Sequence, residues 1–525
     1  MANTGLLILT NTTRVTKLLP IIKQHVSKTL YIQYFPDKNI LCSGSNSIAN
    51  VPSKETHHSR TVANIYTITA PISSRIDIRV LLTSLKSSNL SIINTKKPVE
   101  LVIFDQTYTK KEADTFIQDC LANTSMGCSF ITFNDEQSHY KSDDNLHPIE
   151  GEKTYKNVVL GGTFDRLHNG HKIFLSEAAL HCTNKLTVGV TDTNMLSGKL
   201  LWELIEPCSK RISDLKDFLE DVDSTLFYDV VAIRDMYGPT KYDPTFDMIV
   251  VSEETKRGGD KVNETRLEKG LSKLDIHVVK LLNDRNHRAH EESKISSSNQ
   301  RIRLLGTRLK PPRTEGKALK PYIIGLTGGI ASGKSSVANK LENLGAGLVN
   351  CDKLAHDLYL PGNKCFTAIV ENFGSNILES NGFINRKALG DIVFNDKEQL
   401  NKLNSIIWPL ILVEAKNQID KLYAKGFEVI VMEAAVLIQA KWQNECHEIW
   451  TCIVPQNEAV KRLMERNNLT EAEAKSRIQV QPSNVEQVNE ANAVFCSLWS
   501  HEVTQDQVQK AWDELTMFLL GHTKS

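Results

Sequence analysis

The chain has 525 residues, in which 62 Lys and Arg balance 62 Asp and Glu, so its formal net charge is zero. This length is too great for a single hydrophobic core and predicts two to four domains. The charge balance argues against a nucleic-acid partner, because the chain lacks the basic surplus that binds a phosphate backbone.

The cysteines and the apolar runs restrict the class of protein further. The ten cysteines include no Cys-x-x-Cys pair, and their spacing favours neither a zinc site nor a disulfide framework. The longest mainly apolar stretch, residues 427–438, is far shorter than the ~20 residues that cross a bilayer. We therefore expect a protein of a reducing compartment without a transmembrane segment.

The first 36 residues contain Arg14, Lys17, Lys23 and Lys28 but no Asp or Glu. This composition is typical of mitochondrial targeting segments. The same residues also predict a strand at 5–10 and a helix at 12–26, the start of a folded domain. Both interpretations stay open, so the expected location is cytoplasmic, or mitochondrial in the matrix or on the outer-membrane surface.

Residues 1–150 as a whole predict a small α/β domain. Apolar runs typical of strands lie at 30–35, 76–82 and 99–104, and a helical pattern spans 110–121. No motif in this region indicates chemistry, so we expect a regulatory or localising role. The polar segment 139–152 predicts a connector.

Two further α/β domains are expected. In residues 151–306, strands are predicted at 157–160, 186–190, 229–233, 248–251 and 277–281, and this alternation with helices indicates a doubly wound parallel sheet. The basic, Pro-bearing segment 307–320 predicts an interdomain linker. Residues 321–525 begin with a strand at 322–326 and repeat the strand–loop–helix pattern.

A glycine-rich motif follows the strand at 322–326. The sequence Gly328-Gly-Ile-Ala-Ser-Gly-Lys-Ser335 matches G-x-x-x-x-G-K-[ST] and leads into a predicted helix at 335–343. Lys334 is expected to reach the β- and γ-phosphates of a nucleotide, and Ser335 to hold Mg²⁺. The predicted ATP-binding residues are Gly328, Gly329, Ile330, Ala331, Ser332, Gly333, Lys334, Ser335 and Ser336.

Asp352 lies at the end of the next predicted strand, where ligands bind in open parallel sheets. It is a candidate to accept a proton from an acceptor hydroxyl, or else it caps the following helix. Arg466 lies on a helical stretch that precedes a capping box at Thr470 and Glu473. Arginines on such a hairpin can close over phosphates, or they form a solvated helix face.

Together these residues resemble dephospho-CoA kinases. The similarity extends over residues 324–481 and includes Ile324-Gly-Leu-Thr-Gly-Gly-Ile-Ala-Ser-Gly-Lys-Ser335 and Asn350-Cys-Asp352. The resemblance implies a P-loop kinase fold, with Asp352 as the base for a ribose 3′-hydroxyl and Arg466 as a lid residue. The chain departs from the family pattern at Asn350, where an Asp is frequent.

A second phosphate-binding motif follows the strand at 157–160. The sequence Gly161-Gly-Thr-Phe-Asp-Arg-Leu-His-Asn-Gly-His171 places H-x-G-H at a strand-to-helix turn. Its two imidazoles fall on one side of a helix start, where the helix dipole favours phosphate. We predict an ATP site there, with a structural role left open for His168. Its residues are Gly162, Thr163, Phe164, His168 and His171.

Two other segments fit this site. Ser296, Ser297 and Ser298 precede a predicted helix and offer N–H and O–H donors to phosphates. Arg257 follows the strand at 248–251 and supplies a cation at the carboxyl edge of the sheet. The pattern resembles phosphopantetheine adenylyltransferases, of the nucleotidyltransferase superfamily. That resemblance implies a Rossmann-like fold, His171 as the main catalytic histidine, and Lys199 and Arg257 as ligands of the phosphate of 4′-phosphopantetheine.

The order of the two domains resembles that of fused coenzyme A synthases. This implies that ATP and 4′-phosphopantetheine give dephospho-CoA, which the second domain phosphorylates with ATP and Mg²⁺ to give CoA. Two other classes stay open: a scaffold that binds ATP without turnover, and a synthetase that adenylates an amino acid for a tRNA. The latter is disfavoured because no separate tRNA-binding domain or basic surplus is evident. The oligomeric state is not indicated.

Overall fold

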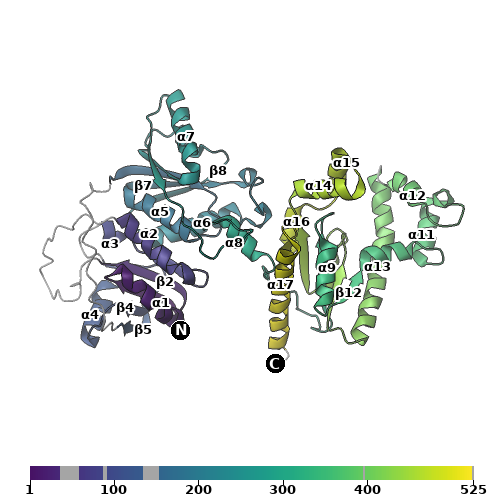
Figure 1. The fold of residues 1–525 in the computed structure, drawn as a ribbon, viewed down its shortest axis with the longest axis horizontal. Helices are drawn as coiled ribbons and strands as arrows, with labels where there is room; N and C mark the ends of the chain where they lie inside the picture. The colour runs from purple at the N-terminus through teal and green to yellow at the C-terminus, as the bar shows by residue number, and fades with distance from the viewer. Residues whose placement is uncertain (36–57, 87–91, 134–152, 394–395, 523–525) are drawn as a thin grey trace. The chain divides into compact units, whose positions relative to one another are not determined.

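The computed structural model describes residues 1–35, 58–86, 92–133, 153–393 and 396–522 (Figure 1). They form two compact units, Met1–Asn299 and Gln300–Ser525. The described residues contain three five-stranded parallel sheets, which confirms the predicted α/β class. Two of the sheets lie in the first unit, which holds an N-terminal domain (1–133) and a middle domain (153–299); the second unit is the C-terminal domain (300–522).

The N-terminal domain is built around β1 (Ala2–Leu9), whose residues from Thr4 onward are buried. Such a run without alternation is expected of a strand covered on both faces. The strand order is β3-β2-β1-β4-β5. The other elements are α1 (Val15–His25), β2 (Val26–Tyr34), α2 (His58–Thr69), β3 (Asp77–Val80), α3 (Thr83–Lys86), β4 (Val99–Phe104), α4 (Lys110–Cys120) and β5 (Thr124–Thr132).

Residues 2–34 therefore form a strand, a helix and a second strand, as the folded-domain interpretation of this segment predicted. Cleavage of these residues as a leader would remove β1, on which β4 pairs, together with β2, on which β3 pairs. The predicted connector at 139–152 lies outside the described residues.

The middle domain has the strand order β10-β9-β6-β7-β8. Counted from the first strand of each domain, this is the same 3-2-1-4-5 order as in the N-terminal domain, so the two sheets share one topology. Its elements are β6 (Tyr155–Gly162), α5 (Asn169–His181), β7 (Cys182–Thr191), α6 (Cys208–Val222), β8 (Phe227–Ile233), β9 (Met248–Ser252), α7 (Lys256–Glu268) and β10 (Asp275–Val279); α8 (Ser297–Leu304) begins at its end.

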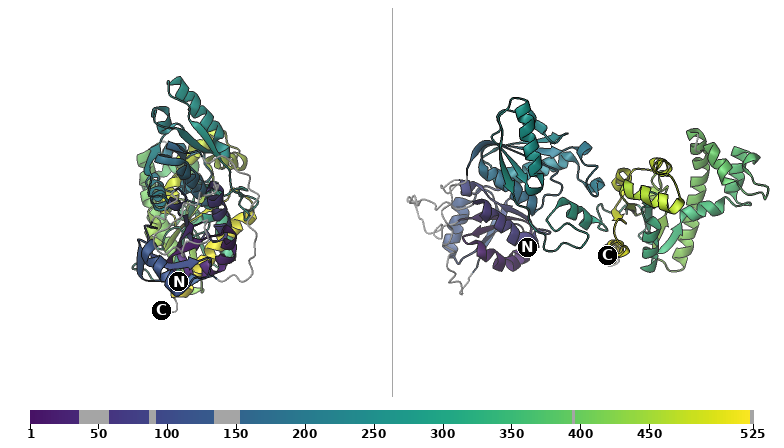
Figure 2. Two further views of the ribbon diagram at one scale, coloured as in Figure 1. Left: turned by 90° about the vertical axis from the view of Figure 1, so that its left-hand side faces the viewer. Right: turned by 45° about the horizontal axis from the view of Figure 1, so that its top comes forward.

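These two domains share one hydrophobic core. A single cluster of buried side chains includes Leu7 and Ile78 of the N-terminal sheet together with Leu175, Phe218 and Val188 of the middle domain. Figures 1 and 2 show the N-terminal elements (purple) lying against the middle domain (blue to teal). The N-terminal region is thus an integral part of the first unit.

The C-terminal domain has the strand order β12-β13-β11-β14-β15. The long helices α13 and α17 can be followed in Figure 1. Its elements are β11 (Tyr322–Gly328), α9 (Lys334–Asn343), β12 (Gly347–Asn350), α10 (Cys351–Leu358), α11 (Lys364–Phe373), α12 (Arg386–Val393), α13 (Lys397–Ala424), β13 (Val429–Glu433), β14 (Glu448–Ile453), α14 (Gln456–Asn467), α15 (Glu471–Gln479), α16 (Asn484–Glu490), β15 (Ala493–Cys496) and α17 (His501–His522).

The segment 307–320, read from the sequence as a linker, is anchored along the C-terminal domain. The guanidinium of Arg308 donates to Glu448 Oε1 at 2.7 Å, and the Arg313 amide donates to the His447 carbonyl at 2.8 Å. Lys317 Nζ donates to the Cys446 carbonyl at 2.6 Å. The segment is therefore a strap on this domain.

Among the described residues, no helix combines the length and apolarity that a membrane crossing requires.

Candidate active sites

The H-x-G-H motif lies where the central strand β6 passes into α5. His168 is the N-cap residue of α5, and its Nδ1 accepts a hydrogen bond of 3.4 Å from the amide of His171. A side chain at Gly170 would touch the His168 ring at 3.1 Å, so glycine lets this ring fold back over the helix start. His168 therefore caps α5, and its role toward phosphate stays a prediction.

The two imidazole rings stack, with 3.8 Å between their centroids and 17° between their planes. Burial lowers the pKa of His168 well below its ordinary value and the pKa of His171 to about 4; Lys199 adds to the second effect and Asp165 opposes it. His168 Nε2 and His171 Nδ1 are buried and have no hydrogen-bond partner within the described parts of the chain. Such ring nitrogens can pair with phosphate oxygens.

Buried charges hold the turn before α5 in shape. Asp165 Oδ1 accepts hydrogen bonds of 3.0 Å from both the Arg166 guanidinium and the Glu206 amide. Arg211 is fully buried and donates to the Thr163 carbonyl at 2.6 Å and to the Thr191 carbonyl at 2.9 Å. The sequence analysis missed Arg211, because no local pattern shows that a helix arginine crosses to this turn.

The predicted serine segment reaches the same turn. Ser297 Oγ donates to the Asp165 carbonyl at 3.0 Å, and Ser296 Oγ accepts from the Asn299 amide at 3.1 Å. Ser298 follows in the first turn of α8. The structure therefore places the serine segment 296–298 against the turn that carries Gly162, Thr163, Phe164, His168 and His171.

Both predicted cations are exposed. Lys199 is exposed and is close enough to His171 to help lower its pKa. Arg257 is exposed in the first turn of α7, which follows β9 after a short 3-10 turn at Glu253–Thr255 and so begins at the carboxyl edge of the sheet. Its guanidinium forms no ion pair with the described residues, which leaves it accessible to an anion.

The glycine-rich loop 328–335 connects β11 to α9, as predicted. Gly333 has φ = +88°, a conformation that glycine adopts readily, and Ala331 adopts φ = +62°. A side chain at Gly328 would lie 2.7 Å from the Cys452 carbonyl, so the loop also requires glycine for close packing. Gly329, Ile330 and Ser332 complete the loop, and Ser336 lies in the first turn of α9.

Lys334 and Ser335 meet two carboxylates at the start of α9. Lys334 Nζ lies 2.7 Å from Asp352 Oδ2 and 2.9 Å from Glu433 Oε1, and Ser335 Oγ donates to Glu433 Oε1 at 2.8 Å. Burial acts to lower the pKa of Lys334, but the two carboxylates outweigh it and the pKa is raised. The lysine therefore stays charged, as a phosphate ligand must.

Glu433 is a site residue that the sequence analysis missed. It ends the buried strand β13, is 1% exposed, and its Oε2 accepts from Asn350 Nδ2 at 2.8 Å. The available signal was a lone acidic residue at the end of an apolar run. Beside the Ser335 hydroxyl, its carboxylate supplies oxygen ligands of the kind that Mg²⁺ prefers.

Asp352 lies in the first turn of α10, and its Oδ1 accepts from the Ala435 amide at 3.2 Å. The alternative that Asp352 caps this helix is wrong, because the N-cap is Asn350, whose side chain accepts from the Lys353 amide. Asp352 is thus held at the phosphate-binding loop and not used to end a helix.

The predicted hairpin consists of α14 and α15, with the expected capping box at Thr470 and Glu473. Arg466 is exposed in the last turn of α14, and its Nε donates to the Asn467 side chain at 3.0 Å. Contacts with the loop come instead from Arg462, which donates to the Ala331 carbonyl at 3.1 Å, and from Gln481, which accepts from the Ile330 amide at 2.7 Å.

The middle and C-terminal domains match known families. Residues 322–497 match the dephospho-CoA kinase family, and residues 159–303 match a cytidylyltransferase-like family. Over 186 residues the chain is 41% identical to a dephospho-CoA kinase of Carboxydothermus hydrogenoformans, covering 35% of this chain and 90% of that protein. A dephospho-CoA kinase of Moorella thermoacetica is 36% identical over 199 residues, which cover 38% of this chain and 94% of that protein.

A solved dephospho-CoA kinase from Campylobacter jejuni aligns with 38% of this chain and 98% of its own, at 25% identity and a TM-score of 0.27. The parallel sheet, the loop 328–335 and its lysine define a P-loop kinase domain, preceded by a nucleotidyltransferase-like domain. The chain belongs to the dephospho-CoA kinase family. With the cytidylyltransferase-like domain in front of the kinase, it has the organisation of a fused coenzyme A synthase.

Proposed function

We propose that the chain carries out two consecutive reactions: ATP and 4′-phosphopantetheine give dephospho-CoA and pyrophosphate, and a second ATP then phosphorylates the ribose 3′-hydroxyl of dephospho-CoA to give CoA and ADP. The observation that carries this proposal is the pair of unlike phosphate-binding turns, one at residues 161–171 and one at 328–335, on a single chain. The kinase match supports the second reaction by name.

In the first reaction, a phosphate oxygen of 4′-phosphopantetheine attacks the α-phosphorus of ATP and the bond to the β-phosphate breaks. The unpartnered ring nitrogens of His168 and His171 fit the role of binding phosphate oxygens as charge develops on them. Serines 296–298 and the N-terminus of α8 suit the β- and γ-phosphates. Lys199 and Arg257 would hold the incoming phosphate from the exposed side of the site.

In the second reaction, the 3′-hydroxyl oxygen attacks the γ-phosphorus while Asp352 accepts the hydroxyl proton, and ADP leaves. Lys334 would exchange its carboxylate contacts for the β- and γ-phosphates. Ser335 and Glu433 would hold Mg²⁺, which neutralises charge on the transferred phosphoryl group. Arg466 would approach the phosphates when the α14–α15 hairpin moves.

The test is product analysis by mass spectrometry after the full chain is incubated with ATP, Mg²⁺ and 4′-phosphopantetheine. The proposal predicts a dephospho-CoA mass followed by a CoA mass. A scaffold that only binds ATP would give neither mass. A synthetase would instead show pyrophosphate exchange that depends on an amino acid, without consuming the pantetheine compound.

We further propose that the protein acts with residues 2–34 retained, in the cytoplasm or at the mitochondrial outer membrane. Support comes from the central position of β1, since a cleaved leader would remove it. Intact-mass analysis of the protein recovered from each cell fraction tests this. A mitochondrial form that lacks these residues would contradict the proposal.

A further inference from the structure

The first turn of α5 is bound to the N-terminal domain through two of its side chains. Asn169 Nδ2 donates to the Tyr66 carbonyl at 2.7 Å. Lys172 Nζ lies 2.5 Å from Asp77 Oδ1 and donates to the Ile78 carbonyl at 2.8 Å. Both Asn169 and Lys172 are at least 95% buried, and they flank the His171 position in the sequence.

Asp77, which forms an ion pair with Lys172, is itself held in place by an ionic network. Arg79, two residues along β3, donates to Asp77 Oδ2 at 2.9 Å and pairs with Asp217 at 2.7 Å and Asp221 at 2.5 Å, both on α6. Lys172 and Arg79 lower the pKa of Asp77 against the opposing effect of burial, so this carboxylate is ionised. Lys172, Arg79 and Asp221 are buried, whereas Asp77 is about one-third exposed. Removal of the Asp77 carboxylate therefore leaves the buried ammonium of Lys172 without its counter-charge.

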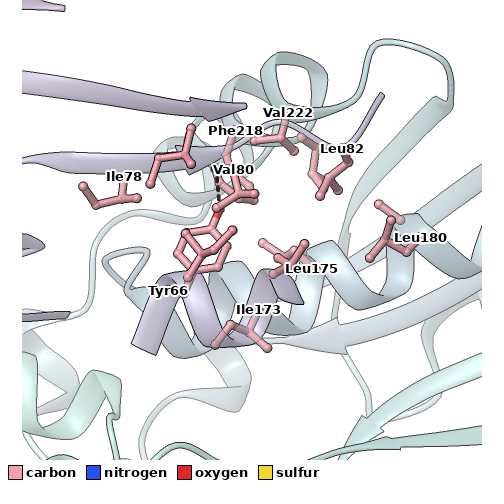
Figure 3. Packing of buried hydrophobic residues seen from close by; sticks show 14 of the residues in the cluster. Tyr66, Ile78, Val80, Leu82, Ile173, Leu175, Leu180, Phe218 and Val222 are labelled. Atoms are coloured by element: carbon pink, nitrogen blue, oxygen red, sulfur yellow. Dashed lines mark hydrogen bonds between the residues drawn. The ribbon is translucent and has the colours of Figure 1, made fainter. Parts of the chain in front are cut away.

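Apolar side chains of the two domains also pack against one another, as Figure 3 shows. The amide of Val80 donates to the Tyr66 hydroxyl at 3.1 Å, and the amide of Leu82 donates to the Val222 carbonyl at 2.8 Å. Strand β3 and helices α2, α5 and α6 therefore form one packed layer. The labelled side chains are Tyr66, Ile78, Val80 and Leu82 of the N-terminal domain and Ile173, Leu175, Leu180, Phe218 and Val222 of the middle domain.

In the N-terminal domain, the turn that follows β1 corresponds to the turn that follows β6 in the middle domain. At the carboxyl ends of β1 and β4, the carboxylate of Asp105 accepts from the Thr10 amide at 2.8 Å and from the Asn11 amide at 3.1 Å. Arg14 donates to the Asp105 carbonyl at 3.0 Å. In open parallel sheets this is the edge where ligands bind, so an internal carboxylate takes the place of an external anion there.

We propose that the N-terminal domain positions the catalytic turn of the middle domain, and that Asp77 is a positioning residue for adenylyl transfer because it anchors Lys172. This inference rests on the proposed first reaction. It gives residues 1–133 a function that needs no ligand of their own. The chemistry is carried by His168 and His171, while the N-terminal domain fixes the direction in which they point.

The predicted effect of Asp77→Asn is selective. The kcat of dephospho-CoA formation should fall about 10- to 100-fold, since small displacements of a catalytic group cost rates of this order. The KM for ATP should change less than kcat. Asp77→Glu, which keeps the charge, should restore part of the rate, and the phosphorylation of supplied dephospho-CoA should not change.

A matched control exists at the far end of the same interface. Lys86 lies 2.8 Å from Asp223 and donates to the carbonyl of Ala179, at the C-terminal end of α5. Lys86→Met should lower the thermal midpoint of the first unit to an extent comparable with Asp77→Asn, but should leave the kcat of the first reaction near the wild-type value. Should Asp77→Asn prevent folding, Asn169→Ala replaces it.

Hydrogen exchange of the peptide 165–176 gives a readout that does not depend on turnover. Asp77→Asn should accelerate exchange in this peptide, and Lys86→Met should not. Equal exchange in both variants, or equal loss of kcat in both, would overturn the positioning role. If the wild-type chain forms no dephospho-CoA while the exchange difference persists, the proposed first reaction fails and the anchoring of the turn stands.

Discussion

Lys334 and Asp352, which are separated by 18 positions in the sequence, form an ion pair of 2.7 Å at the start of α9. The pair joins the cation expected to bind transferred phosphate to the carboxylate expected to accept the hydroxyl proton. Its position at the carboxyl edge of β11 and β12 is where a P-loop kinase brings its two substrates together.

Asp352→Asn should reduce the phosphorylation of dephospho-CoA about 10²- to 10⁴-fold, because the amide cannot accept the proton. The first reaction should continue, so dephospho-CoA should accumulate from 4′-phosphopantetheine. The matched control is Asp357→Asn on the exposed side of the same helix, which should retain the wild-type rate. Unchanged kinase turnover in the Asp352 variant would remove this residue from the mechanism.

Glu433→Gln should lower the kcat of the kinase reaction about 10²- to 10³-fold, the usual cost of losing one charged stabilising group. It should also raise the Mg²⁺ concentration needed for half-maximal rate, because the amide is a poorer ligand for a hard cation. A Mg²⁺ titration of the initial rate measures both. The control is Glu428→Gln, at the exposed position just before β13, which should change neither the kcat nor the Mg²⁺ dependence. A Mg²⁺ dependence equal to wild type would show that Glu433 only supports Lys334.

The pKa of His171, lowered to about 4 chiefly by burial, makes the stability of the first unit depend on pH. Between pH ~6.5 and pH 4 the unfolded chain binds a proton that folded His171 does not, so acid favours unfolding in this window. Each pKa unit of difference between the folded and unfolded states corresponds to about 1.4 kcal/mol. The His171→Gln variant should therefore lose about 3 kcal/mol less of its unfolding free energy than the wild type across this pH window.

Denaturant unfolding of the wild type and the His171→Gln variant at pH 7.5 and pH 4.5 checks this prediction. The stability gap between the two proteins should shift in favour of the variant at the lower pH. His501→Gln, at an exposed position of the C-terminal domain, serves as a control and should leave the first unit unaffected. A gap that is the same at both pH values would mean that His171 titrates normally.

The strap 307–320 should be required for a stable kinase domain. Glu448 is 1% exposed and accepts from Arg308, from the Tyr322 hydroxyl at 2.8 Å and from the Trp450 indole at 2.8 Å. Arg308→Ala should destabilise the domain by about 2 kcal/mol, because the remaining partners compensate only part of the buried charge.

Lys320→Ala removes an exposed ion pair with Glu428 in the same segment and should cost less than about 1 kcal/mol. Calorimetric midpoints of the two variants measure the difference. Equal midpoints would show that the Glu448 contact contributes little.

The sequence predicted those parts of the sites that are local in the chain. The turns at 161–171 and 328–335 combine glycines and the expected phosphate ligands within a few residues, and both form strand-to-helix turns as predicted. Strands such as β4 and β9 were predicted from continuous apolar runs. Helix α2 was not predicted, because its buried Val62, Ile65 and Tyr66 lie among polar residues of weak helix propensity.

Residues that act across the fold could not be predicted in this way. Glu433, Arg211 and Asp77 reach their sites from strands or helices distant in the sequence, and each looks locally like an ordinary polar residue of its element. Only the parallel order of the strands brings them to the turns. For the same reason, the packing of the N-terminal domain against α5 had no signal in the sequence.

A complementation assay with two single variants of the full chain tests the central claim most directly. His171→Ala should form no dephospho-CoA yet convert supplied dephospho-CoA to CoA, and Lys334→Ala should stop at dephospho-CoA. Mixed together with ATP, Mg²⁺ and 4′-phosphopantetheine, the two variants should again produce CoA. If the mixture makes no CoA, or if both variants lose the same step, the assignment of one reaction to each phosphate-binding turn is wrong.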